Sequence, residues 1–240
     1  MKSISPRTLL TMAIFMSLAA CASTFSNNEG SRMSVEETKH ALVGDWFSLA
    51  PEIRPSATKN PDGSLRPFYL SRQFKYLGDD RFELTIANSA DPYGKVPVAR
   101  IYLRGHILWK GDHPNAPGAQ KVDFVADGDY QVTPLAQPFA DLLNKVASAG
   151  YAKWEVNVPQ KIFGKSFAPF GLAEGRNFME YDLVYISRDL LFWGARNIDG
   201  RGFDKEENRP TNLQIPLTAK RSDCTSRGCF SSSDTESAVF

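Results

Sequence analysis

The spacing of apolar residues divides the chain into a short helical start and a long series of strands. Ser34 is followed three residues later by Glu37, and apolar side chains recur at loosely helical spacing as far as Val43. Serine followed by glutamate at this distance forms a capping box, so we expect a short helix that ends at Gly44. From Trp46 onward the apolar period becomes two, which indicates β-strands.

The strand patterns are separated by Gly, Asp, Asn and Pro at short spacing, which is typical of antiparallel sandwiches and barrels. The longest pattern covers residues 96–110, and we expect a turn near Asp127–Gly128 between two later strands. The segment Ser187–Asp189 is expected to join two aromatic strands as a hairpin. Further strand patterns lie at residues 67–77, 80–88, 120–133, 151–158, 178–187, 189–198 and 213–220.

A second helix is predicted within this series of strands. Thr133 and Pro134 form a good cap and first-turn pair, an apolar stripe follows, and Gly150 ends it. Gly44 and Trp46, at the junction between the first helix and the strands, mark a common start of small ligand-binding barrels. We therefore expect a mostly β fold, an antiparallel lipocalin-like β-barrel with two short helices.

The N-terminal residues indicate export. Lys2 and Arg7 precede an apolar run at residues 9–18, which is too short to span a membrane and is followed by polar residues. The sequence LAAC at residues 18–21 resembles a bacterial lipobox, in which Cys21 becomes the lipidated first residue of the mature protein. The alternative is an ordinary signal with Cys21 incidental, which would make the protein secreted rather than lipid-anchored.

The charge balance gives no support for a nucleic-acid partner. The full chain has 28 Lys and Arg against 27 Asp and Glu, and loss of Lys2 and Arg7 with the signal leaves 26 against 27. A chain this close to neutral has neither a basic field nor an acidic tail. Its 42% hydrophobic and 12% aromatic content is ordinary for one packed globular domain.

Two further cysteines, Cys224 and Cys229, lie in a Ser-rich tail. An oxidising compartment permits a small disulfide loop between them, which would hold the tail rather than the core. A metal site needs more ligands than these two, and no histidine lies nearby. We therefore expect neither a metal nor a cofactor.

Catalytic motifs do not stand out in the sequence. The patterns of serine hydrolases, P-loop proteins, dinucleotide-binding proteins and zinc proteases are absent. The three histidines, His40, His106 and His113, fall on a predicted helix, a strand and a turn, and a metal-binding triad would need all three to converge. We predict that the protein is not an enzyme.

Aromatic and arginine residues on the strands leave two interpretations open. Aromatic side chains fill a barrel core or line a cavity for an apolar ligand. Arg72 and Arg104 interrupt apolar strands, where an arginine either pairs with a carboxylate or contacts a ligand head group. Glu52 and Arg54 share one face of an extended segment and can pair with each other or reach Arg72 and Asp182. The candidate ligand-binding residues are Trp46, Arg54, Arg72, Leu103, Trp109 and Trp193.

Several short motifs occur in a fixed order along residues 38–220. They include Gly44-x-Trp46, Glu52-x-Arg54-Pro55, Leu70-x-Arg72-x-Phe74, Glu180-Tyr181-Asp182-Leu183, LLFWGARNIDG and Arg209-Pro210-Thr211. In this order they resemble the domain of adenomatosis polyposis coli down-regulated one (the APCDD domain). The resemblance implies a β-barrel-like module with a hydrophobic groove or cavity and no catalytic activity. Animal members of that family are membrane-tethered antagonists of Wnt signalling, thought to bind lipid, including the acyl chain of Wnt.

The sequence departs from that family at two positions. Pro51 and Gly94 stand where the animal members carry cysteines, which fits the joint loss of one disulfide. A role in Wnt signalling does not suit a bacterial lipoprotein. The resemblance therefore carries over only lipid or acyl-chain binding, as a hypothesis.

Four segments are predicted along the chain. They are a lipoprotein signal peptide at 1–20, a flexible tether at 21–33, an APCDD-like β-barrel domain at 34–220 and a disordered tail at 221–240. The leading hypothesis is a non-catalytic lipoprotein of the bacterial cell envelope, membrane-tethered and facing the periplasm, that binds a lipid or another apolar ligand. The alternative is an envelope module with a filled barrel core, which binds a protein through loops such as 199–212.

Overall fold

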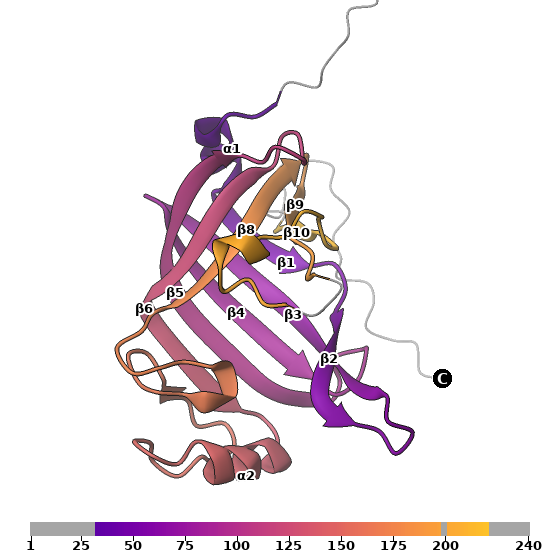
Figure 1. Cartoon of the computed structure of the whole chain (residues 1–240), viewed down its shortest axis with the longest axis vertical. Coiled ribbons are helices and arrows are strands. Elements are labelled where there is room, and N and C mark those ends of the chain that lie inside the picture. Colours follow the sequence, from indigo (N-terminus) through magenta and orange to yellow (C-terminus); the bar gives the residue numbers. More distant parts are fainter. Residues whose placement is uncertain (1–31, 198–200, 221–240) are drawn as a thin grey trace, which may run out of the picture. The chain divides into compact units, whose positions relative to one another are not determined.

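The computed structural model describes residues 32–197 and 201–220, and these form a mostly β fold (Figure 1). They contain ten strands in one antiparallel sheet and two α-helices, which confirms the predicted fold class at this level. The predicted signal peptide, most of the tether, the tail and the cysteines Cys21, Cys224 and Cys229 lie outside the described residues.

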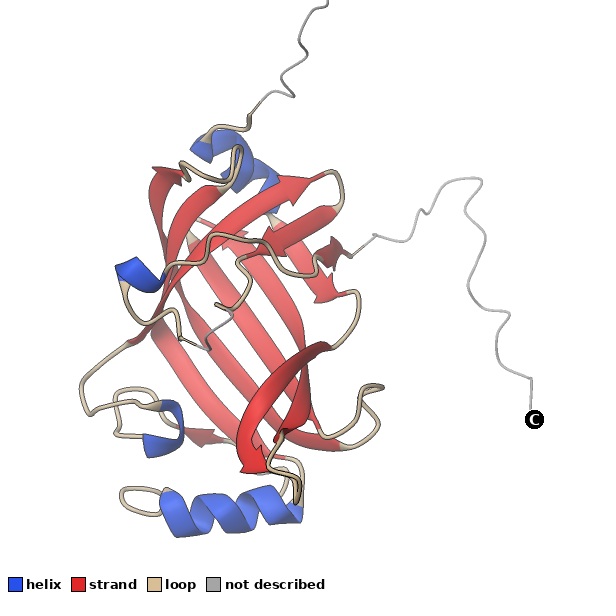
Figure 2. Cartoon of the chain, turned by 45° about the vertical axis from the view of Figure 1, so that its right-hand side comes forward, coloured by secondary structure: helices blue, strands red, loops and turns tan. Residues whose placement is uncertain are grey.

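The helices are α1 (Val35–Leu42), α2 (Gln137–Val146) and the 3-10 turns η1 (Ala168–Phe170) and η2 (Glu206–Asn208). The strands are β1 (Gly44–Ser48), β2 (Glu52–Lys59), β3 (Leu65–Gly78), β4 (Arg81–Ser89), β5 (Pro97–Asp112), β6 (Gln120–Pro134), β7 (Gln160–Lys161), β8 (Phe178–Ser187), β9 (Leu190–Trp193) and β10 (Leu217–Ala219). Figures 1 and 2 show α1 and α2 at opposite ends of the sheet.

Helix α1 begins at the predicted capping box. The Ser34 hydroxyl accepts a hydrogen bond from the Glu37 amide at 3.2 Å, and the Ser34 amide donates to the Glu37 carboxylate at 2.7 Å. At the other end, Leu42 is fully buried, and its carbonyl accepts a hydrogen bond from the Trp46 indole at 2.8 Å. This bond ties the end of the helix to β1, so the change from helix to strand occurs where the sequence predicts it.

The strand pairing returns to its starting strand. The order is β1-β10-β9-β8-β6-β5-β4-β3-β2, with β7 added against β6, and β1 also pairs with β3. Trp46 of β1 accordingly lies opposite Ala219 on one side and Phe74 on the other. Because the strands do not stand evenly around one axis, the lipocalin-like barrel stays a prediction.

The inner face of the sheet carries the core. On β5, Ile101, Leu103 and Ile107 are buried, whereas the alternate residues Arg100 and Arg104 are exposed, as the period of two predicts. A cluster of four aromatic side chains packs inside with ring centroids 5.0–6.0 Å apart. This aromatic cluster consists of Phe74, Phe82, Phe124 and Trp193.

The predicted turn near Asp127–Gly128 is wrong, because β6 continues through these residues. Arg104 pairs with Asp129 and His106 pairs with Val125, so residues 126–128 lie opposite Gly105 alone. Such a bulge bends a strand without ending it. A side chain on Gly105 would collide with the Val125 carbonyl, so only glycine permits this close approach.

The second helix exists, but its predicted start at Thr133–Pro134 is wrong. Both residues still belong to β6 and pair with Arg100 and Ala99 of β5. The helix begins at Gln137, and its first turn contains a proline, Pro138, whose missing amide hydrogen is not needed there. Pairing with β5 therefore continues β6 through Thr133 and Pro134, the residues that resemble a helix cap.

Residues 151–158 are a loop rather than the predicted strand. The Asn144 side chain accepts a hydrogen bond from the Trp154 amide at 2.8 Å and donates to the Trp154 carbonyl at 2.9 Å. The indole of Trp154 is buried and donates to the Ala147 carbonyl at 2.7 Å. A side chain from α2 thus satisfies the backbone groups for which a neighbouring strand would otherwise be needed. The hairpin at Ser187–Asp189 is confirmed, since β8 pairs with β9 across it.

Candidate functional site

A cavity of about 490 Å³ lies against the inner face of the sheet, and we call it the polar cavity. Its lining comes from β2, β3, β4, β8, β9 and the segment that follows β9. It reaches the surface beside Leu65, which is exposed. The polar residues of the lining are Arg54, Arg72, Glu180, Asp182, Arg196 and Gln214.

A smaller space of about 70 Å³, the apolar pocket, adjoins the polar cavity and shares part of its lining. The shared residues are Leu84, Ile86, Glu180, Asp182 and Trp193. The remaining wall is almost entirely apolar and consists of Phe82, Leu103, Phe124, Ala126, Tyr130 and Phe178. An apolar pocket therefore adjoins a cavity lined by charged residues.

The arginines of the polar cavity are engaged by protein groups. A single carboxylate, Glu52, contacts Arg54 at 2.7 Å and also contacts Arg72. Arg54 further donates to the Gln214 side chain at 3.2 Å, and the Arg72 guanidinium lies 5.2 Å from the ring centroid of Trp193. The predicted pairing of Glu52 with Arg54 is therefore confirmed, and Arg72 joins the same carboxylate.

Two carboxyl groups face the arginines from β8. Asp182 is buried and accepts hydrogen bonds from the amides of Leu183 at 2.7 Å and Gly194 at 2.9 Å. Burial and the neighbouring charge of Glu180 raise the pKa of Asp182 to about 7. Burial also raises the pKa of Glu180, although Arg72 and other nearby guanidinium groups oppose that rise.

Glu180 and Trp193 retain unused hydrogen-bonding capacity. Both line the polar cavity and the apolar pocket. The Trp193 side chain is 4% exposed, and its Nε1–H has no acceptor within the part of the chain that the structure describes. The half-buried Glu180 carboxyl interacts electrostatically with Arg72, Arg54 and Arg196, but no hydrogen bond joins it to a described residue. A buried polar group without a partner costs about 1–3 kcal/mol, so the unpaired Trp193 Nε1–H is an unusual feature for a packed interior.

The structure places four of the six candidate ligand-binding residues at these spaces. Arg54, Arg72 and Trp193 line the polar cavity, and Leu103 lines the apolar pocket. Trp46 lies instead beneath α1, where its indole is bonded to the Leu42 carbonyl. Trp109 also lies outside both linings and donates to Asp80 at 2.8 Å.

Sequence analysis did not identify Glu180 as a candidate. The available signal is the alternation of Glu180 and Asp182 with Val184 and Ile186 on one face of β8. The last three of these are buried, so the pattern places two carboxylates on a core-facing stripe. Charged groups on such a stripe need partners or serve a ligand.

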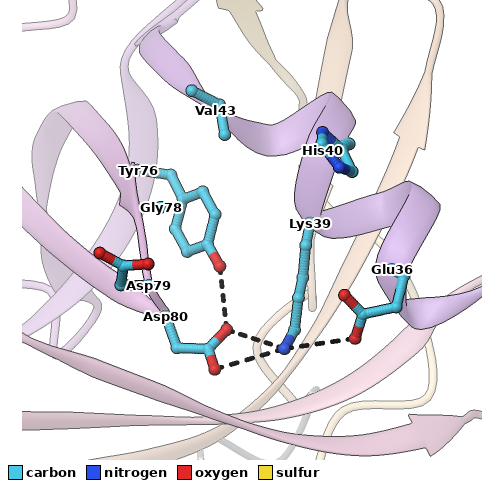
Figure 3. Close-up of a pocket in the computed structure, with 8 residues that line it drawn as sticks. All are labelled: Glu36, Lys39, His40, Val43, Tyr76, Gly78, Asp79 and Asp80. Carbon is cyan, nitrogen blue, oxygen red and sulfur yellow. Dashed lines mark hydrogen bonds and ion pairs between the residues drawn. The ribbon is translucent and has the colours of Figure 1, made fainter.

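A second hollow of about 430 Å³ lies between α1 and the turn from β3 to β4 (Figure 3). Asp80 accepts hydrogen bonds there from Tyr76 at 3.0 Å, from Trp109 at 2.8 Å and from Lys39 at 3.3 Å. Burial alone would raise the pKa of Asp80, but these donors outweigh it and lower the pKa below its usual value. Because the donors are already used by Asp80, this cluster fixes the helix to the sheet and offers little to a ligand.

The three histidines have separate surroundings. His106 Nδ1 lies 2.7 Å from an Asp127 carboxylate oxygen, and His113 Nδ1 accepts a hydrogen bond from the Asn115 amide at 3.2 Å. His40 lies on α1 at the hollow of Figure 3. Over residues 32–197 and 201–220, no group of three His, Cys, Asp or Glu side chains is arranged to hold a metal ion.

Comparison with known protein families gives no assignment, since no family model matches the chain. The resemblance to the APCDD domain therefore stays a prediction. Among the described residues, no helix combines the length and the apolar character needed to cross a membrane.

Proposed function

We propose that the chain is a non-catalytic lipoprotein whose lipocalin-like β-barrel binds an amphiphilic ligand, such as part of a lipid acyl chain with its head group. The observation that carries this proposal is the apolar pocket beside the polar cavity, with Trp193 and Ile86 in both linings. Lipidation of Cys21 would tether the protein to a bacterial membrane, facing the periplasm. The closed strand pairing through β1 and β3 supports the barrel.

The size of the two spaces limits the ligand. The polar cavity, of about 490 Å³, falls in the lower half of the range of ordinary small-molecule sites, roughly 300–1,000 Å³, and the apolar pocket adds only about 70 Å³. Each CH₂ group buried contributes about 0.8 kcal/mol, so a few methylenes in the apolar pocket suffice for modest affinity. A short acyl chain fits this description better than a complete phospholipid.

A variant that fills the cavity tests the proposal. Ile86 lines both spaces, so Ile86→Trp should fill them, whereas Leu108→Trp adds the same bulk on the outer face of β5, where Leu108 is 39% exposed. Native mass spectrometry of the domain that starts after Cys21 would be recorded with added octanoate, octanamide and lysophospholipid. We expect adducts for the wild type and Leu108→Trp, and none for Ile86→Trp.

Two results would contradict ligand binding in the barrel. One is an unmodified mass for the wild type with every probe, including protein purified from its own host without detergent. The other is equal adduct formation by wild type and folded Ile86→Trp, because the ligand would then bind elsewhere.

A second candidate function is an envelope module that binds a protein partner and has a filled core. The aromatic cluster favours it, because its four rings leave only about 70 Å³ of apolar space. The partner would contact the segment 201–212, where Glu207 is exposed. A photo-crosslinker at Glu207 should then capture one defined envelope protein, while native mass spectrometry shows no ligand in the barrel.

A further inference from the structure

The guanidinium groups at the polar cavity already contact protein groups, although Arg72 Nη1 has no hydrogen-bond partner among the described residues. Glu52 contacts both Arg54 and Arg72, Arg54 also bonds to Gln214, and Arg72 lies over the Trp193 ring. Arg196 also has an interaction partner. A ligand carboxylate would therefore compete with Glu52 for these cations rather than find one reserved for it.

The formal charges around the cavity also balance. Among the described residues, three arginines at positions 54, 72 and 196 face three carboxyl groups at positions 52, 180 and 182, so these six charges sum to zero when all are ionised. An anionic head group would add a fourth negative charge close to the two carboxyls of β8. A cationic head group would add a fourth positive charge close to the arginines. Desolvated like charges repel strongly, so the balance favours a neutral head group.

Two groups with spare capacity at both the polar cavity and the apolar pocket are of opposite hydrogen-bonding type. Glu180 offers acceptor oxygens and Trp193 offers one Nε1–H donor, and both residues line the polar cavity and the apolar pocket. A head group that satisfies both must donate one hydrogen bond and accept another. Hydroxyl and amide groups meet this requirement, whereas ethers and methyl esters only accept.

We propose that the ligand is a neutral amphiphile with a hydroxyl or amide head group, which donates a hydrogen bond to Glu180 and accepts one from Trp193 Nε1–H. This inference rests on the proposed ligand-binding function. It assigns Glu180 as the residue that determines head-group specificity. Arg54 and Arg72 contact Glu52, so they are not assigned to the ligand.

Four probes with the same eight-carbon chain test the inference by isothermal titration calorimetry at pH 8. Octanamide carries donor and acceptor, methyl octanoate only an acceptor, and octanoate and octylammonium opposite charges. We expect octanamide to bind at least about tenfold more tightly than the other three, as one hydrogen bond to a charged group would give. Wild type that binds methyl octanoate as tightly as octanamide overturns the inference.

Variants of Glu180 identify the residue responsible. Glu180→Leu should abolish the preference for octanamide over methyl octanoate, and Glu180→Gln, which retains an acceptor oxygen, should restore part of it. Removing one negative charge should also raise octanoate affinity severalfold in both variants. Glu83→Gln, on β4, serves as the matched control and should behave like the wild type. If Glu180→Leu does not fold, Glu180→Gln still decides, because unchanged octanoate affinity contradicts the charge argument.

The outcomes separate this inference from the proposed function. If none of the four probes binds the wild type, ligand binding in the barrel fails and the inference fails with it. If all four bind equally and the Glu180 variants bind as the wild type does, only the head-group inference is overturned.

Discussion

Replacing Arg209 with methionine should destabilise the protein more than any change of a surface arginine. The Arg209 guanidinium donates to the carbonyls of Val122 at 2.6 Å and Asp182 at 2.8 Å, and to the Asp123 carboxylate at 2.6 Å. It also lies 5.3 Å from the ring centroid of Tyr181. The side chain is 6% exposed, so it holds the segment after β9 against β6 and β8 from a buried position.

The size of the effect follows from the groups left behind. Removing one partner of a buried ion pair costs about 3–5 kcal/mol, because an uncompensated charge remains in the interior. Lys110 lies 3.4 Å from the other Asp123 oxygen and retains part of the compensation, although its side chain is 44% exposed. The two carbonyls lose their donor as well. We therefore expect Arg209→Met to lower the free energy of unfolding by about 3 kcal/mol.

Urea unfolding followed by tryptophan fluorescence measures this change, which should appear as a lower midpoint with an unchanged m-value. The control is Arg81→Met, because Arg81 lies 3.9 Å from Asp79 and both side chains are largely exposed. That change should stay within about 0.5 kcal/mol. In the Asp123→Asn background, Arg209→Met should cost clearly less than in the wild type. A loss below about 1 kcal/mol, or an equal loss in both backgrounds, would refute the reasoning.

Three further predictions use the same unfolding assay. The pKa of Asp182 is about 7 in the folded state, against a reference value of 3.8. Between these two values the folded protein holds a proton on Asp182 that the unfolded chain has released, so the free energy of unfolding falls as pH rises from about 4 to about 7. Asp182→Asn should remove this decline and gain up to about 4 kcal/mol at pH 8; a decline as large as that of the wild type would contradict the assignment. Gly194→Ala would press a methyl group against Pro210 and should cost about 1–3 kcal/mol, and an unchanged midpoint would contradict this steric argument. Ser34→Ala should cost about 1 kcal/mol by removing the cap on α1, and an unchanged midpoint would show that the cap is dispensable.

The features that the sequence predicts correctly are those set by neighbours along the chain. The cap of Ser34 and Glu37 involves residues three apart, and the alternation on β5 places Leu103 inside and Arg104 outside whatever strand lies alongside. The hairpin at Ser187–Asp189 is equally local, since Arg188 adopts a positive φ of 54° in the turn. These features need no knowledge of the tertiary structure.

The errors arise where a distant residue decides the local structure. Residues 126–128 remain in β6 because Gly105 on β5 leaves room for the bulge. Trp154 lies in a loop because Asn144 on α2 binds its backbone on both sides. Neither Gly105 nor Asn144 can be identified as a partner from the spacing of apolar residues, because that spacing carries no information on contacts between elements.

The candidate site was predictable in part for the same reason. Arg54 and Arg72 stand out because they interrupt apolar strand patterns, and the structure brings both to the polar cavity. Trp46 and Trp109 also face inward. The alternation along a strand predicts which face of the sheet a side chain lies on, but not whether it lies next to the cavity. Both lie outside the linings of the polar cavity and the apolar pocket.

The cost of the charged interior distinguishes the two candidate functions. A module with a filled core gains nothing from Glu180 or from an unsatisfied Trp193 Nε1–H. Burial raises the pKa of Glu180 even with arginines nearby, so the ionised carboxylate is disfavoured in the folded state. Glu180→Leu should then raise stability under both hypotheses. Only ligand binding predicts that the same substitution abolishes the preference for an amide head group. A gain in stability together with that loss would mark Glu180 as a residue retained for binding at the expense of stability.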